Sequence, residues 1–295
     1  MKKLLLPALL CCCMTLAGAD DWKSLKDAAA KAETGKDFKQ AVELYVKAAQ
    51  AAVKPGDRLD ALQKAARLLA KEKKNGEAKA LLLAFAEDEK TPASQKVMAD
   101  LACAKLAETE EEAMRFLEQG IARKTGDWTE AACFLGKAKI LLNQKKADEA
   151  EALFKQVAAC ETYSDISRAE AFSALAETAA KKKDYAAAHA NLEQIRALGK
   201  KRYAFLATDA SVKEAKLFAS EQKYDEALKL WSEIAADAKI KTKTRTDALD
   251  SIMTLEFNRG RMDEAKKVLE LFKSYGLPVS KKAQKLEKDI KDLTE

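Results

Sequence analysis

An alanine that recurs seven times at nearly constant spacing constrains the fold of this chain more than any other feature of its sequence. Successive copies stand 37, 35, 37, 38, 39 and 38 residues apart. In most copies an apolar residue lies sixteen positions before the alanine, a small or apolar one lies twelve before it, and a large apolar one lies four after it. Spacings of four place side chains on one face of an α-helix. Each copy is therefore predicted to be a helical hairpin, with the alanine where the two helices come closest; the seven are Ala41, Ala78, Ala113, Ala150, Ala188, Ala227 and Ala265.

A short polar segment before each alanine predicts the turn of each hairpin. In the first copy, Gly35 is expected to adopt a positive φ and end the first helix, and Asp37 to cap the second helix by accepting its free amide hydrogens. Comparable turns are predicted at 75–76, 183–185 and 258–260. The third copy is the weakest, because its turn at 108–112 contains neither glycine nor an aromatic residue.

The composition agrees with a helical fold. The 295 residues include only 10 Gly and 4 Pro, while 48% are hydrophobic and 34% are charged. So few helix breakers leave little room for strands or hairpin turns of a sheet, so the fold class is predicted to be all-α. After the seventh copy, Pro278 is expected to end the helical segment and Ser280 to start a last helix. The apolar face of this helix carries Ala283, Leu286, Ile290 and Leu293.

With this repeated alanine and the large apolar residue after it, the sequence resembles a tetratricopeptide repeat array over residues 20–276. The resemblance implies a right-handed α-solenoid of about seven helical hairpins, closed by a capping helix at 277–295. The sequence departs from the family pattern in two ways. Alanine or a larger residue replaces the consensus glycine, and the period is longer than the family's 34 residues.

Residues 1–19 are predicted to be a secretory signal peptide rather than part of the fold. Lys2 and Lys3 precede a largely apolar run at 4–16, and small residues at 17–19 fit cleavage after Ala19. A retained membrane anchor is disfavoured because this run is shorter than the roughly 18 apolar residues of a spanning helix. A lipoprotein is disfavoured because no small residue immediately precedes Cys11, Cys12 or Cys13. The product is therefore expected to be periplasmic or secreted, with no membrane span after removal of the signal.

The sequence offers no pattern typical of catalysis, cofactor binding or metal binding. His189 is the only histidine and is interpreted as a partly exposed hairpin residue. Cys103, Cys133 and Cys160 remain after signal removal; they form no C-x-x-C pair and are interpreted as small buried hydrophobes. One disulfide among them is the alternative in an oxidising compartment. We therefore expect no enzyme, no cofactor and no metal.

The charge pattern does not favour nucleic acid either. The formal net charge is +6 and falls to +4 once Lys2 and Lys3 are removed, and acids and bases alternate along the predicted helices. Such interleaving is typical of a solvated helical surface rather than of a basic patch that follows a phosphate backbone.

What remains is the concave groove that the resemblance implies, lined by the first helix of each hairpin. Its mildly basic character would suit a protein or peptide partner, in particular an acidic one, and Glu177 and Asp250 are its minority acids. An accessory that binds an envelope polymer (a glycan or peptidoglycan), or an enzyme subunit that acts on one, is the alternative. A structural spacer without a dedicated ligand is a third possibility. The groove residues implied by the resemblance are Arg67, Lys71, Lys139, Asn143, Lys181, Lys216 and Asn258.

Overall fold

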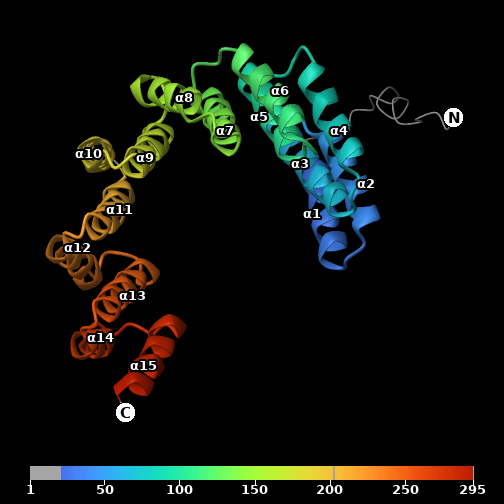
Figure 1. Cartoon of the computed structure of the whole chain (residues 1–295). Helices are drawn as coiled ribbons and strands as arrows, with labels where there is room; N and C mark the ends of the chain where they lie inside the picture. The colour runs from blue at the N-terminus through green and yellow to red at the C-terminus, as the bar shows by residue number, and fades with distance from the viewer. Residues whose placement is uncertain (1–20, 202, 295) are drawn as a thin grey trace. The chain divides into compact units, whose positions relative to one another are not determined.

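The computed structural model describes residues 21–201 and 203–294, and across these ranges the chain forms fifteen helices and no strand (Figure 1). The predicted signal peptide at 1–19 lies outside the described residues. The chain divides into two compact units, Met1–Ile140 and Leu141–Glu295, so the division falls inside α7. The first unit holds α1 (Asp21–Thr34), α2 (Phe38–Ala51), α3 (Pro55–Lys71), α4 (Asn75–Glu87), α5 (Ala93–Lys105), α6 (Glu110–Ala122) and most of α7 (Trp128–Asn143).

The second unit continues the same alternation of helices. The contacts run between consecutive helices within each unit, and alternate helices also meet at α3 with α5 and at α9 with α11. The unit holds α8 (Ala147–Ala159), α9 (Asp165–Lys181), α10 (Tyr185–Lys201), α11 (Ala204–Ser220), α12 (Tyr224–Ala236), α13 (Thr242–Asn258), α14 (Met262–Ser274) and α15 (Lys281–Thr294).

The repeated alanines lie where the sequence predicts them, near the start of the second helix of each hairpin. Six of the seven are fully buried, and only Ala113 keeps part of its surface exposed. The large residues four positions later are also core residues in most copies, as Tyr45 and Trp231 illustrate with 2% and 4% exposure. The all-α repeat of helical hairpins predicted from the spacing is therefore confirmed.

The hairpin turns share one backbone motif that the sequence located only in part. A residue with positive φ stands five positions before the alanine in six of the seven copies: Lys36, Lys73, Lys145, Lys183, Gln222 and Gly260. The next residue donates its backbone N–H to the carbonyl five residues earlier, as Asp37 does to Ala32 at 2.9 Å. This is the Schellman closure of a helix.

The prediction that Gly35 adopts the positive φ is wrong, because Lys36 takes that conformation instead. The hydrogen bond from Asp37 to Ala32 fixes which residue must be left-handed, whatever side chain it carries. Similarly, the predicted turn at 75–76 lies within α4, and Lys73 is the left-handed residue. The capping role of Asp37 is confirmed, since its carboxylate accepts the backbone N–H of Gln40 at 3.0 Å.

The third hairpin turns differently, as its sequence suggests. Between α5 and α6, no residue with positive φ occurs at the expected position. Thr109 instead accepts the N–H of Glu112 at 3.1 Å, and the Glu112 carboxylate accepts the N–H of Glu108 at 2.9 Å. Such reciprocal side-chain capping closes a helix start without a left-handed residue.

The last helix, α15, occupies the stretch predicted after Ser280 and packs against α13 and α14. The Ser280 hydroxyl accepts the N–H of Ala283 at 3.0 Å and donates to Asp250 on α13 at 2.6 Å. The N-terminus of α15 is thereby tied to the last hairpin. The boundaries at 20–276 and 277–295 stay predictions.

Two of the three cysteines of the described chain are buried, as predicted, and all three are free thiols. Cys103 and Cys133 are fully buried, and burial raises the pKa of each thiol to about 12. Cys160 is only half-buried, so the prediction of a buried residue is wrong there. No described helix is both long enough and apolar enough to cross a membrane.

Candidate functional site

The first candidate site is a pocket of about 420 Å³ in the first unit, between α3 and α5. We call it the Trp128 pocket, because the indole of Trp128, at the start of α7, forms part of its lining. Leu82, Met98, Leu101 and Leu106 contribute apolar surface. The pocket thus lies on the first helices of the second and third hairpins. Its full lining is Gln63, Ala66, Arg67, Ala70, Leu82, Met98, Leu101, Ala102, Lys105, Leu106 and Trp128.

Trp128 is half exposed, and a braced loop holds it there. Its relative exposure is 50%, which is unusual for so large an apolar residue. On either side of it, the Asp127 carboxylate accepts the backbone N–H of Thr129 at 2.8 Å and the Thr125 hydroxyl at 2.9 Å. The buried Glu130 side chain accepts the N–H of Gly126 at 2.6 Å. These bonds fix the loop without using the indole ring.

The charge of Asp127 is part of this brace. Burial raises the pKa of this carboxyl, but the hydrogen bonds from Thr129 and Thr125 outweigh burial, so the pKa lies below its ordinary value. An ionised carboxylate at the N-terminus of α7 also interacts favourably with the helix dipole. The ionised Asp127 carboxylate therefore helps to hold the backbone on which Trp128 is exposed.

Two cations and no acid line the Trp128 pocket. Arg67, one of the predicted groove residues, donates to Glu33 on α1 at 2.7 Å while its side chain stays 57% exposed. Glu33 is held in turn by the hydroxyl of Tyr45 at 3.1 Å. Lys105, at the end of α5, is exposed. The pocket combines an apolar surface with positive charge.

A second pocket of about 910 Å³ lies in the second unit, along α11 and α13. We call it the Phe205 pocket, after the aromatic ring that is 54% exposed there. Lys216, another predicted groove residue, contributes to its lining. Its charged residues balance, with four aspartates and four lysines: Asp209, Asp237, Asp247, Asp250, Lys216, Lys239, Lys241 and Lys282.

Asp250 illustrates how the structure revises a sequence interpretation. The sequence suggests it as an acid of the groove, and it does line the Phe205 pocket. However, its side chain is largely buried and accepts the hydroxyl of Ser280 at 2.6 Å. Its main contact is therefore with the start of α15.

The other predicted groove residues are exposed on first helices but line neither pocket. Lys71, at the end of α3, lies with its ammonium 5.6 Å from the centre of the Phe38 ring. Such a cation–π contact gives it a local partner. The remaining four are Lys139 and Asn143 on α7, Lys181 on α9 and Asn258 on α13. The assignment of all seven residues to one groove stays a prediction.

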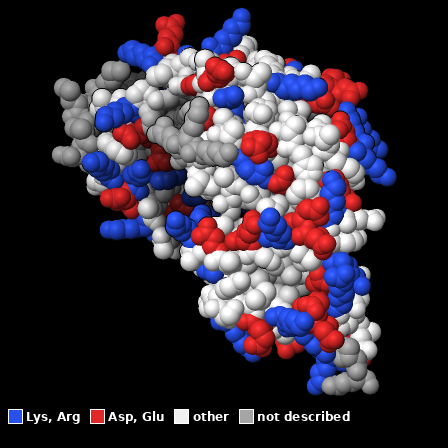
Figure 2. Space-filling model, turned by 90° about the vertical axis from the view of Figure 1, so that its left-hand side faces the viewer, with Lys and Arg blue, Asp and Glu red and all other residues white. Residues whose placement is uncertain are grey.

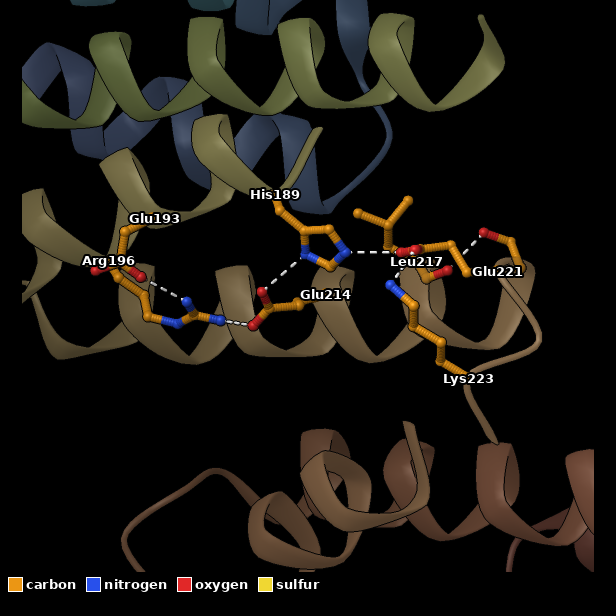
Figure 3. Close-up of polar contacts among 8 residues, drawn as sticks. His189, Glu193, Arg196, Glu214, Leu217, Glu221 and Lys223 are labelled. Atoms are coloured by element: carbon orange, nitrogen blue, oxygen red, sulfur yellow. Dashed lines mark hydrogen bonds and ion pairs between the residues drawn. The ribbon is translucent and has the colours of Figure 1, made fainter. Parts of the chain in front are cut away.

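His189 is the centre of a polar cluster that joins α10 to α11 (Figure 3). Its Nδ1 lies 3.0 Å from Oε1 of Glu214, and its Nε2 lies 2.7 Å from Oε1 of Glu221. Arg196 contacts the second oxygen of Glu214, and Lys223 contacts the second oxygen of Glu221 at 2.7 Å. Each carboxylate therefore has two basic partners.

This cluster braces the hairpin interface and does not present a free acid or base. Burial raises the pKa of Glu221, but the hydrogen bonds from Lys223 and His189 outweigh burial and lower the pKa. The imidazole ring also packs on Phe218, with ring centres 4.7 Å apart. His189 is partly exposed, as predicted, and lines neither pocket. Among the described residues, no group of three or more His, Cys, Asp or Glu is placed to hold a metal ion.

The charges on the surface are mixed rather than separated. Figure 2 shows Lys and Arg side chains interspersed with Asp and Glu over the face that it displays. Elsewhere among the described residues, ion pairs also join acids and bases of different helices, for example Lys213 with Glu177 at 3.0 Å and Lys182 with Glu151 at 2.8 Å. This face carries no continuous basic patch.

Sequence reasoning missed Trp128, Lys105 and Phe205. The sequence did carry a signal for Trp128. The buried stripe of α7 includes Phe134, and a spacing of four leads back from Phe134 to Glu130. Trp128 lies six residues before Phe134 and is therefore off that stripe. A large aromatic residue outside the buried stripe indicates an exposed ring. Lys105 carried no comparable signal among so many lysines.

Comparison with known proteins supports the fold. No protein-family model matches the chain, and no curated protein matches its sequence. Among solved structures, pilF from Pseudomonas aeruginosa is 19% identical, with a TM-score of 0.50 over 80% of this chain and 99% of that one. A tetratricopeptide repeat protein from Parabacteroides merdae is 11% identical, with a TM-score of 0.51 over 92% of this chain and 99% of that one. At such identities the likeness concerns the fold alone: the chain has the helical-hairpin architecture of a tetratricopeptide repeat array.

Proposed function

We propose that this protein is an exported, non-enzymatic scaffold that binds a segment of a partner protein on the first helices of its repeats. The observation that carries the proposal is the Trp128 pocket. It combines an apolar surface with a tryptophan whose exposure the Thr125–Glu130 hydrogen bonds maintain.

An exposed tryptophan on a fixed loop is well suited to binding. Burying a large side chain of this kind contributes roughly 1.5 to 3 kcal/mol, and tryptophan is among the residues that dominate protein interfaces. Little ordering entropy opposes binding when the loop is already fixed. A pocket of about 420 Å³ also lies within the usual range of ligand sites.

The fold supports the same proposal at a coarser level. Stacked helical hairpins create extended surfaces that commonly bind protein segments. The envelope-polymer alternative would instead require affinity for a glycan or for peptidoglycan fragments. The structural-spacer alternative would require that no ligand bind the exposed apolar surface.

Selection from a displayed random-peptide library on the purified chain tests this function. We expect enrichment of peptides that slow hydrogen exchange in α3, α5 and the loop before α7, because bound peptide would restrict opening there. Absence of any enriched peptide, or protection confined to other helices, would contradict the proposal. Binding of purified peptidoglycan fragments in place of peptides would favour the envelope-polymer alternative.

Export has its own test. The apolar run at 4–16 and the small residues at 17–19 support it. N-terminal sequencing of the protein from its native host is expected to begin at Asp20. A cell-associated chain that retains residues 1–19 would refute export by this route.

A further inference from the structure

The lining of the Trp128 pocket narrows the kind of segment that it accepts. We infer that it binds a large apolar side chain with a neighbouring carboxylate, that is, an acidic peptide segment with an aromatic residue or leucine beside Asp or Glu. This inference rests on the proposed function, since it specifies the ligand of the same site.

The apolar side chain of the ligand follows from the apolar residues that line the pocket. Met98 and Leu101 are partly buried residues of α5 that face the pocket together with Trp128. Of these three side chains, only Trp128 can form a strong hydrogen bond, through its indole N–H. An apolar side chain that covers them removes their surface from water, whereas a polar one would lose its own hydration.

The carboxylate follows from the charges. Arg67 and Lys105 both line the pocket, and no acid does. In the described part of the chain no salt bridge is formed by Lys105, whereas Arg67 is held by Glu33 at 2.7 Å. Arg67 has further N–H donors beyond the one that Glu33 accepts, because a guanidinium carries five. An anionic group between Arg67 and Lys105 would meet one cation that is held by Glu33 and one exposed cation that forms no salt bridge among the described residues.

The Phe205 pocket does not share this excess of positive charge. It also has a half-exposed aromatic ring, but its four lysines are matched by four aspartates. Charge complementarity therefore favours an acidic segment only at the Trp128 pocket.

Fluorescence anisotropy with four labelled peptides of one Gly/Ser-rich framework tests the inference. The peptides carry Leu-Asp, Leu-Asn, Leu-Lys or Gly-Asp at their centre. We expect Leu-Asp to bind tightest, about fivefold tighter than Leu-Asn, with a difference that shrinks as salt is added. In Lys105→Glu the preference should shift towards Leu-Lys. The matched control Lys241→Glu, in the Phe205 pocket, should leave the order unchanged.

The outcomes distinguish failure of the inferred ligand from failure of the proposed peptide-binding function. Equal binding of all Leu peptides, or an unchanged order in Lys105→Glu, would overturn the inferred ligand while leaving a peptide-binding scaffold. Failure of the wild-type chain to bind any of these peptides or any library peptide would refute both. Binding of an anionic glycan in place of every peptide would also overturn the inference. Circular dichroism of each variant ensures that the helical fold is kept.

Discussion

The Trp128 pocket and the Phe205 pocket occupy comparable places in two different parts of the repeat array, yet they differ in charge and support. Both lie along the first helices of successive hairpins, and both expose half of an aromatic ring. The Trp128 pocket is smaller, purely cationic at its charged positions, and bordered by a hydrogen-bonded loop. The larger Phe205 pocket neutralises its own charge. Similar backbones can thus present different charges beside an exposed aromatic residue.

The largest expected effect separates the two aromatic rings. Trp128→Ala should weaken binding of a selected peptide by roughly 30-fold, about 2 kcal/mol, because it removes the main apolar contact of the pocket. Titration calorimetry would compare this loss with that of Phe205→Ala, because Phe205 has a similar exposure, 54% against 50% for Trp128, but lies in the other unit. Equal losses in the two variants would remove the distinction between the pockets.

The next prediction compares the repeated alanines of the two units. Ala227 is fully buried in the sixth hairpin, so Ala227→Trp should lower the free energy of unfolding by roughly 1 to 3 kcal/mol through overpacking. Ala113, in the third hairpin, is only half-buried, so Ala113→Trp should cost clearly less. Urea unfolding followed by circular dichroism provides the measurement. A larger loss at Ala113 would show that the third hairpin is packed more tightly than its burial indicates.

Two glycines provide a smaller effect with opposite signs in the two units. Gly260 has φ +74°, so Gly260→Ala should destabilise the second unit by about 1 kcal/mol, because alanine is strained in that conformation. Gly76 lies in the first turn of α4 with open space around it, so Gly76→Ala should stabilise the first unit by about 0.5 kcal/mol. Thermal unfolding of both variants is sufficient; a common sign would invalidate the comparison.

The smallest expected effect concerns the pH dependence of stability, to which two largely buried carboxyl groups contribute with opposite signs. Hydrogen bonds lower the pKa of Glu221 in the second unit, so its stabilising contribution is present above its unfolded pKa and is lost as pH falls through the folded value. Burial raises the pKa of Asp100 in the first unit despite its ion pair with Arg123 at 2.6 Å. The contribution of Asp100 to stability therefore increases as pH falls through its raised folded-state pKa.

Urea midpoints between pH 7 and pH 3 distinguish the two carboxyls. Relative to wild type, Glu221→Gln should lose stability less steeply on acidification, and Asp100→Asn more steeply. A fluorescent label in each unit should report the unfolding transition around the carboxyl of that unit. Parallel pH profiles for the two variants would contradict the opposite signs.

The sequence predicted the hairpins well because their information is local. Ala41 and Tyr45 are four residues apart on one helix, and such spacing reports directly on the buried face. The left-handed residue of the turn was misplaced, since glycine is only a preference there and the hydrogen-bond closure selected Lys36. The sequence showed where the turn lies, but not which of its residues adopts the left-handed conformation.

The site was predicted less well because it depends on distant residues. Arg67 could be proposed from its place on a first helix, and it does line the Trp128 pocket. Its contact with Glu33, 34 residues earlier, and the approach of Trp128 to α3 and α5 depend on how successive hairpins pack. No periodicity in one helix contains that information. The same reason explains why the contact between Asp250 and Ser280 was missed.

The recurrent Schellman closure also bears on how such a chain can change its length. Lys36, Lys73, Lys145 and Lys183 hold the same backbone conformation at the same distance from the next alanine. A duplication or deletion that starts at one of these residues and ends just before another would join two helices through an intact turn. The left-handed positions are therefore places at which a second helix and the first helix of the next hairpin can be gained or lost together while the turn is kept.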